Sequence, residues 1–206
     1  MIYGIAGASG TGKTTLGQSV GEALSIPFVR TSITDMARKA GFNAVGRLEL
    51  HERLALQESL LKQFEELLLK TKGPVIFDRT PLDLIGYLGA EVHMHSHGEL
   101  TMSDLHKIDA YFTRCQELTS RSFDQVFVTS ILPHYEEVET RPGFNPAYQR
   151  HVQFLIMGSI FEGDCDLSVS ILSTDDLQDR ISIMSETIVT RLDQIEMEKR
   201  KNRHLH

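Results

Sequence analysis

The sequence predicts an α/β protein with a five-stranded parallel sheet that is covered by helices on both faces. Short apolar runs alternate along the chain with longer segments of helical periodicity, which are too long to be hairpin connections. The 206 residues are enough for one well-buried domain, and no repeat or low-complexity linker divides them. We therefore expect a single domain spanning residues 1–206.

The first elements establish this alternation. Residues 1–6 form an apolar run that ends in glycines and predict a buried strand. Residues 13–25 follow with their apolar positions on one face of a helix. Residues 26–30 predict a second short strand, and residues 33–42 a short helix whose end carries a glycine as a stop signal.

The middle of the chain contains the strongest helical pattern. A Leu-rich stripe that alternates with Glu, Lys and Gln predicts a helix over residues 46–73, which Gly73 and Pro74 end. Residues 74–78 are apolar throughout, so we expect a strand that is buried on both faces. Residues 81–94 predict another helix.

The second half of the chain continues in the same way. Residues 102–121 predict a helix with Ser103 as its N-cap, and residues 131–146, which contain three prolines, predict a loop. The other predicted strands are residues 124–130 and 167–172, and the other predicted helices are residues 146–163 and 175–201. The first strand should then run centrally, with the ligand beyond the carboxyl ends of the strands.

The composition argues against nucleic-acid-coating, disulfide-rich and membrane-spanning proteins. The net charge of −7 argues against a surface that coats nucleic acid, because phosphate backbones are bound by excess Lys and Arg. Cys115 and Cys165 lie far apart, which suggests neither a disulfide framework nor a zinc knuckle. The chain has no apolar run of membrane-spanning length and no cleavable leader pattern, so we expect a cytoplasmic protein without a membrane partner.

The stretch "GIAGASGTGKTT" at residues 4–15 lies between the first predicted strand and the first predicted helix. Gly7, Gly12, Lys13 and Thr14 satisfy the phosphate-binding loop pattern G-x-x-x-x-G-K-[ST]. Glycines let successive backbone N–H groups point inward, and the helix N-terminus adds its positive dipole end. Lys13 can reach the β- and γ-phosphates, and the Thr14 hydroxyl can ligate Mg²⁺.

This motif predicts a three-layer P-loop NTPase fold that binds ATP and Mg²⁺. The residues expected to contact the nucleotide are Gly7, Ala8, Ser9, Gly10, Thr11, Gly12, Lys13, Thr14 and Thr15.

The end of the third predicted strand, "VIFDRTPLD", indicates what becomes of the nucleotide. A switch GTPase would carry an Asn-Lys-x-Asp box after the fourth strand, where this chain reads "VFVTSILP". A ring-forming ATPase would usually carry a second acid where this chain has Arg79. Asp78 can approach Mg²⁺ and the attacking oxygen, and Arg79 can neutralise charge on the transferred phosphoryl group. These features favour a kinase.

Together the two motifs resemble those of the P-loop nucleoside and nucleotide kinases. This family includes thymidylate kinases, deoxynucleoside kinases and nicotinamide riboside kinases, with small phage or bacterial relatives often labelled AAA-type ATPases. Thymidylate kinases have a similar Asp-Arg-aromatic motif after the third strand, and deoxynucleoside kinases have Glu-Arg-Ser. Asp78-Arg79-Thr80 matches neither fully, which leaves the acceptor open.

The resemblance also implies a lid that delivers arginines to the transferred phosphoryl group. The matching segment is about residues 131–151, with Arg141 and Arg150 as candidates. Such kinases seat the adenine on the loop after the fifth strand, here residues 173–176. The candidates for contacting the acceptor are Arg30, Asp83 and Tyr87.

The expected function is transfer of the γ-phosphoryl group of ATP to a small nucleoside or nucleoside monophosphate. Lys13 and Mg²⁺ bound at Thr14 and Asp78 would hold the donor, Asp78 would orient or deprotonate the acceptor, and Arg79 would stabilise charge. Nicotinamide riboside and a hydroxylated base in DNA are alternative acceptors, and a nucleotide-dependent ATPase or switch is the alternative from another class. The oligomeric state, including a homodimer, stays open.

One further cluster is set aside as a polar loop. His93, His95 and His97 alternate in "HMHSHGE", which would place three imidazoles on one side of an extended segment, where they could bind Zn²⁺. The segment lies between predicted helices and has no adjacent cysteine, so we favour the loop interpretation.

Overall fold

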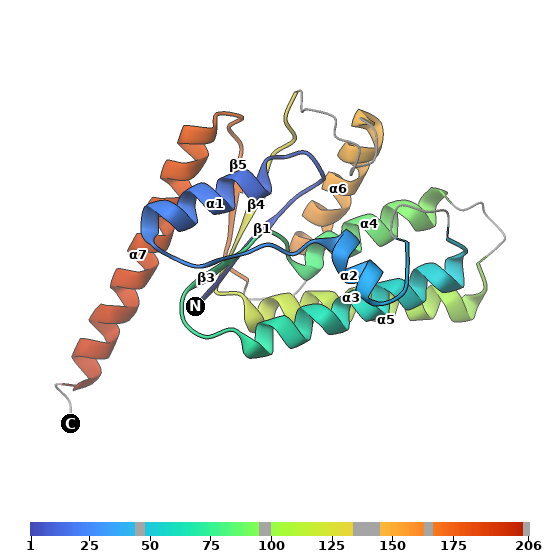
Figure 1. Ribbon diagram of the computed structural model, residues 1–206, viewed down its shortest axis with the longest axis horizontal. Helices are drawn as coiled ribbons and strands as arrows, with labels where there is room; N and C mark the ends of the chain where they lie inside the picture. The colour runs from blue at the N-terminus through green and yellow to red at the C-terminus, as the bar shows by residue number, and fades with distance from the viewer. Residues whose placement is uncertain (44–47, 95–99, 134–144, 163–166, 204–206) are drawn as a thin grey trace.

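Five parallel strands form one sheet in the order β2-β3-β1-β4-β5 in a computed structural model of the chain (Figure 1). The structure describes residues 1–43, 48–94, 100–133, 145–162 and 167–203. The strands are β1 (Ile2–Ala6), β2 (Phe28–Val29), β3 (Val75–Phe77), β4 (Gln125–Thr129) and β5 (Val169–Leu172). The helices are α1 (Lys13–Leu24), α2 (Ile33–Lys39), α3 (Leu50–Lys70), α4 (Pro81–Met94), α5 (Met102–Ser122), α6 (Pro146–Glu162) and α7 (Leu177–Arg203).

β1 runs through the middle of the sheet, as predicted. Gly4 pairs with Phe77 of β3 on one side and with Val126 of β4 on the other. Because all the strands run the same way, the loops after β1, β3 and β4 leave from one edge of the sheet. This edge brings together segments that lie more than a hundred residues apart in the sequence.

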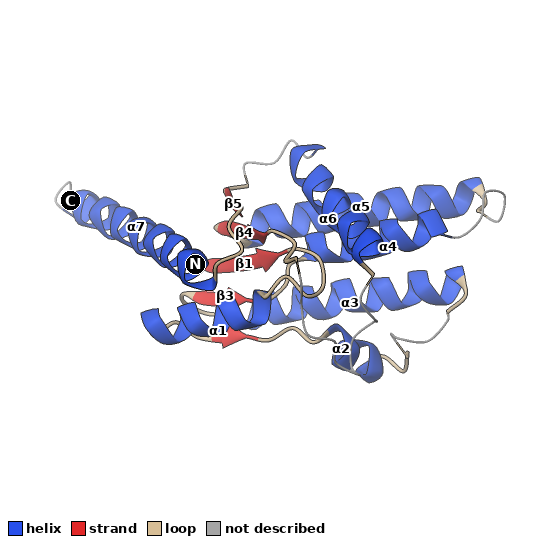
Figure 2. Ribbon diagram, turned by 90° about the horizontal axis from the view of Figure 1, so that it is seen from above, coloured by secondary structure: helices blue, strands red, loops and turns tan. Residues whose placement is uncertain are grey.

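Helices cover both faces of the sheet and form the expected three layers (Figures 1 and 2). The alternation of β4 shows how one strand serves both faces: Val126 and Val128 belong to the core under α3, α4, α5 and α6, and Phe127 to the core under α1 and α7. All three side chains are buried, and burying each is worth about 1.5–3 kcal/mol. This period-2 packing fixes the register of the central strands.

The predicted boundaries need three corrections. The long helix predicted over residues 46–73 occupies Leu50–Lys70, and the strand predicted over residues 26–30 has only two residues. The N-cap of α5 is Thr101, not Ser103: the Thr101 hydroxyl accepts from Asp104 N, and the Asp104 carboxylate accepts from Thr101 N. The helix begins after Thr101 because this capping box satisfies two backbone N–H groups, that of Asp104 and that of Thr101.

No helix within the described ranges combines the length and apolar character needed to cross a membrane.

Candidate active site

The phosphate-binding loop connects β1 to α1 and takes its shape from three glycines. Gly7, Gly10 and Gly12 have φ values of 144°, 76° and 83°, which side-chain-bearing residues rarely adopt. At Gly7 the surroundings also exclude a side chain, because a Cβ there would lie 2.5 Å from the Thr129 Oγ1 atom. Gly12 is the N-cap of α1, so the loop leads directly into the free N–H groups of that helix.

Lys13 begins α1 and folds back under the loop. Its side chain is 6% exposed, and its Nζ atom donates to Gly7 O at 2.5 Å and to Ala8 O at 2.7 Å. The ammonium group is therefore held beside the first turn of the loop, at the mouth of the cradle that the backbone N–H groups form. The role of Lys13 in binding the β- and γ-phosphates stays a prediction from the motif.

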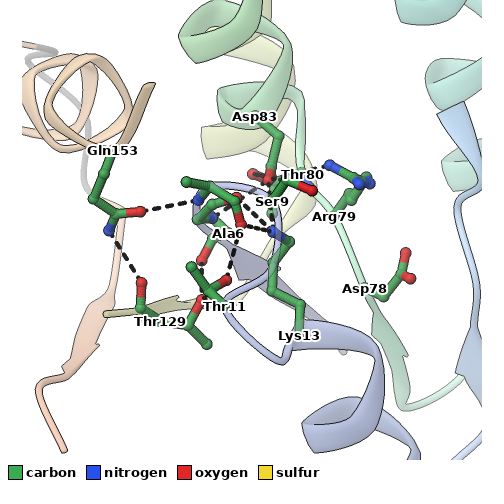
Figure 3. Close-up of polar contacts among 12 residues, drawn as sticks. Ala6, Ser9, Thr11, Lys13, Asp78, Arg79, Thr80, Asp83, Thr129 and Gln153 are labelled. Carbon is green, nitrogen blue, oxygen red and sulfur yellow. Dashed lines mark hydrogen bonds and ion pairs between the residues drawn. The ribbon is translucent and has the colours of Figure 1, made fainter. Parts of the chain in front are cut away.

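Asp83, in the first turn of α4, contacts the phosphate-binding loop (Figure 3). Its carboxylate is fully buried, accepts from Gly7 N at 3.3 Å and lies 3.7 Å from the Lys13 Nζ atom. Its other oxygen accepts from Thr80 N at 2.9 Å. Burial raises the pKa of Asp83, although the charges of Lys13 and Arg79 act in the opposite direction. The sequence predicts that Asp83 contacts the acceptor, whereas its carboxylate here contacts Gly7 and Lys13 of the loop together with Arg79 and Thr80.

Asp78 follows β3 and joins three segments of the site. Its Oδ1 atom accepts from Thr31 N at 2.7 Å and from the Thr31 hydroxyl at 2.5 Å, and its Oδ2 atom accepts from the Thr14 hydroxyl at 3.1 Å. Both carboxylate oxygens are thus engaged, and the residue is 4% exposed. A carboxylate and a hydroxyl side by side at the loop are oxygen donors that suit Mg²⁺, so the residues present fit the expected metal.

Arg79 approaches the same oxygen of Asp83 as Lys13 does, and Tyr87 lies next to Arg79. The Arg79 Nη1 atom is 3.9 Å from the Asp83 Oδ1 atom, and its guanidinium carbon lies 5.9 Å from the centre of the Tyr87 ring. Burial alone would lower the pKa of Arg79, but Tyr87 and the nearby carboxylates raise it overall. Burial raises the pKa of Tyr87. Arg79 is therefore a firmly charged group next to the loop.

Three helices bring further polar side chains to this region. Arg53 of α3 forms an ion pair with Glu91 of α4 at 2.5 Å, and both side chains are mostly buried. Tyr148 of α6 is close enough for Glu91, Tyr87 and Arg53 to perturb its pKa, which burial raises. We call Arg53, Arg79, Tyr87, Glu91 and Tyr148 the helix-junction cluster, because they come from α3, from α4 and the turn before it, and from α6.

Sequence reasoning missed two glutamines of α6 that hold the loop. Gln153 accepts from Ala8 N at 2.9 Å and donates to Thr129 O at 3.0 Å, so it connects the loop to the end of β4 (Figure 3). Gln149 donates to Ser9 O at 2.5 Å. Their spacing of four residues places both on one face of the helix, but sequence alone does not tell which element that face meets.

A third missed residue is Arg180, in the first turn of α7. It is 2% exposed and donates to backbone carbonyls of three different segments. Nothing in its sequence context distinguishes it from a solvated arginine at a helix start.

The other predicted site residues fall into two groups. Arg30, at the end of β2, and Arg150, in α6, are exposed, as is Thr15, whereas Ser9 and Gly10 are partly exposed at the loop. Arg141, His95 and His97 lie outside the described residues, as does most of the predicted lid, and the side chain of His93 is not described. Within the described ranges, no group of three or more His, Cys, Asp or Glu residues could hold a metal ion.

Comparison with known proteins shows the family and the fold of the chain. A family model described as "AAA domain" matches residues 3–180, so the chain belongs to this AAA domain family. No curated protein sequence matches the chain significantly.

Solved structures of kinases share the fold over nearly the whole chain. Deoxyadenosine kinase from M. mycoides with bound dCTP is 13% identical, with a TM-score of 0.67, and the match covers 92% of this chain and 100% of that one. Thymidylate kinase from Candida albicans is 15% identical, with a TM-score of 0.64, and the match covers 92% of this chain and 91% of that one. NadR protein in complex with NAD and AMP-PNP is 16% identical, with a TM-score of 0.58, and the match covers 90% of this chain and 48% of that one. The chain therefore has the fold of the P-loop nucleoside and nucleotide kinases.

Proposed function

We propose that this protein is an ATP-dependent phosphotransferase that passes the γ-phosphoryl group to a small nucleoside or nucleoside monophosphate. The observation that carries the proposal is the position of Asp78, which contacts the Thr14 hydroxyl of the loop and is followed by Arg79 instead of a second acid. An ATPase needs a group that activates water, whereas a kinase needs charge at the transferred phosphoryl group and a place for an acceptor. Arg79 in place of a second acid therefore favours a kinase over an ATPase.

The donor half of the site is formed by the loop, Lys13, Thr14 and Asp78. The loop N–H groups and Lys13 would bind the phosphates, and Thr14 with Asp78 would hold Mg²⁺. When bound, Mg²⁺ neutralises charge on the phosphate oxygens. Because both oxygens of Asp78 are engaged by Thr14 and Thr31, we assign this carboxylate to holding the metal and orienting Thr14 in preference to deprotonating the acceptor.

The acceptor half is proposed at the helix-junction cluster. The Tyr87 hydroxyl and the Arg79 Nη1 atom are buried there, and neither makes a hydrogen bond of good geometry, although Arg79 lies next to both Tyr87 and Asp83. A ligand that entered beside them would supply the missing hydrogen-bond partners. Arg79 would also stabilise charge on the transferred phosphoryl group. Arg30 is exposed at the end of β2, where it can contact an anionic acceptor.

The comparisons support this class of acceptor. One structural relative is named a deoxyadenosine kinase and another a thymidylate kinase, and these act on nucleosides and nucleotides by name. The NadR protein, seen with NAD and the ATP analogue AMP-PNP, keeps nicotinamide riboside as a second candidate acceptor.

A screen for ADP release tests the proposal. The chain is incubated with Mg-ATP and separate pools of nucleosides, nucleoside monophosphates, nicotinamide riboside and DNA that contains hydroxylated bases. Lys13→Ala provides the inactive background, and Lys70→Ala, which removes an exposed charge at the end of α3, is the matched control. One pool should raise ADP release above the Lys13→Ala background. If none does, the kinase proposal is wrong.

A further inference from the structure

The guanidinium group of Arg180 occupies a position between three segments of the nucleotide site. Its Nη1 atom donates to Thr11 O of the phosphate-binding loop at 2.7 Å, and its Nη2 atom donates to Ser130 O after β4 at 3.1 Å. Its Nε atom donates to Thr174 O, in the loop after β5, at 2.7 Å. One side chain therefore spans the loop at residues 7–14 and the loop at residues 173–176.

Burying this charge is costly, and no carboxylate among the described residues forms an ion pair with it at close range. Burial lowers the pKa of Arg180, and the charge of Asp175 opposes this only in part. A buried guanidinium persists only where hydrogen bonds compensate for lost water. Here the compensation comes from backbone carbonyls, so Arg180 holds backbone positions.

The bond to Thr11 O has a direct consequence for phosphate binding. In a planar trans peptide the C=O and the N–H point in opposite directions. Fixing the Thr11 carbonyl on Arg180 therefore directs the Gly12 N–H away from Arg180, and the positive charge polarises that peptide and strengthens its donor. Gly12 has φ of 83°, and a Cβ on it would lie 3.8 Å from the Arg180 Nη1 atom, so the two groups are close neighbours.

We propose that Arg180 is a positioning residue that fixes the phosphate-binding loop relative to the loop at residues 173–176, so that the triphosphate and the base of ATP bind cooperatively. This inference rests on the proposed function and on the sequence-based expectation that the adenine lies against residues 173–176, the loop that follows β5 at the carboxyl edge of the sheet. Arg180 acts through backbone and not on the nucleotide itself, because it is 2% exposed and its three bonds are already made.

The test compares binding of Mg-ATP with binding of Mg-tripolyphosphate, which has no base, by titration calorimetry on the full chain. Arg180→Met keeps much of the side-chain volume but removes every donor, and Arg180→Lys keeps the charge with a single nitrogen that cannot span three carbonyls. Arg200→Met is the matched control, since it removes an arginine from the same helix that is 72% exposed.

Arg180→Met should raise the Kd of Mg-ATP at least about tenfold and the Kd of Mg-tripolyphosphate only a few-fold. Both ligands lose the well-oriented Gly12 N–H, but only ATP has a base that also loses its fixed position on the loop at residues 173–176. Arg180→Lys should give an intermediate change, and Arg200→Met none. In turnover, the KM for ATP should rise while the KM for the acceptor stays unchanged.

The proposal would be overturned if Arg180→Met raised the Kd values of Mg-ATP and Mg-tripolyphosphate by the same factor, or changed neither. If Arg180→Met does not fold, the ratio of the two Kd values in Arg180→Lys decides in the same way. The binding assay needs no acceptor, so a failed acceptor screen leaves it intact. A wild-type chain that binds neither ligand contradicts the proposed function and this inference together, whereas equal losses contradict this inference alone.

Discussion

Replacement of Gln153 by leucine tests whether α6 holds the phosphate-binding loop in place. Gln153 is 8% exposed, accepts from Ala8 N and donates to Thr129 O, and both of those residues are fully buried. Leucine is similar in size but provides neither bond. The substitution therefore leaves one buried N–H and one buried carbonyl without their partner.

The magnitude follows from these two groups. Each buried backbone group left unsatisfied costs about 1–3 kcal/mol, and the added apolar burial of leucine returns about 1–2 kcal/mol. The two ranges combine to a net loss of about 0–5 kcal/mol, and we expect Gln153→Leu to lower the free energy of unfolding by about 2.5 kcal/mol, the middle of that range. Affinity for Mg-ATP should fall as well, because the loop loses the contact that fixes Ala8.

Urea unfolding followed by circular dichroism measures this change. Gln18→Leu, an exposed position on α1, is the control and should stay within about 0.5 kcal/mol of the wild type. Gln153→Glu separates structure from charge: it keeps an acceptor for Ala8 N but puts a negative charge beside the loop, so it should weaken ATP binding more than Gln153→Leu does. A loss below about 0.5 kcal/mol in Gln153→Leu would refute the claim that α6 holds the loop.

Three other perturbations test the rest of the site. Asp78→Asn should lower turnover at least about a hundredfold and raise the Mg²⁺ concentration needed for half-maximal turnover, and unchanged turnover would remove Asp78 from the mechanism. The pKa of Asp83 is raised in the folded chain, so its contribution to stability is present at low pH and is lost as pH rises from about 4 through the folded pKa. The free energy of unfolding should therefore fall with pH over this range, and Asp83→Asn should make that slope flatter. Identical slopes in the variant and the wild type would contradict the raised pKa of Asp83. Gly7→Ala should lower the free energy of unfolding by more than about 2 kcal/mol in thermal unfolding, because Gly7 has a positive φ and a Cβ there would clash with Thr129. The control is Gly158→Ala on α6, where a Cβ would meet nothing within 4 Å, and it should be neutral or stabilising by up to about 1 kcal/mol.

The fold was predictable because its signals are local. Residues 1–6, 74–78 and 124–130 contain the central strands, and burial on both faces explains the apolar side chains at their centres. The motif at residues 7–14 is equally local, since the phosphate-binding loop needs its glycines, lysine and threonine in one short stretch. Boundaries were less accurate where tertiary contacts and capping decide them, as at Thr101.

The parts that the sequence did not reveal depend on contacts between distant segments. Gln153 and Arg180 reach the loop from more than a hundred residues away, and a buried glutamine or arginine looks in sequence like a solvated one. The sequence predicts Asp83 at the acceptor, whereas its contacts with the loop depend on the tight turn at Thr80, whose N–H and hydroxyl donate to the Asp83 carboxylate. Periodicity does not tell which neighbour such a side chain meets.

The central claim is that the γ-phosphoryl group is passed to an acceptor and not to water. The most direct measurement uses ATP labelled in the γ-phosphoryl group and counts label in the acceptor, label in inorganic phosphate and ADP formed, with wild type and Lys13→Ala side by side. We predict one labelled nucleoside or nucleotide product per ADP and almost no inorganic phosphate. ADP formation matched by inorganic phosphate, at a rate that no acceptor changes, would contradict the account.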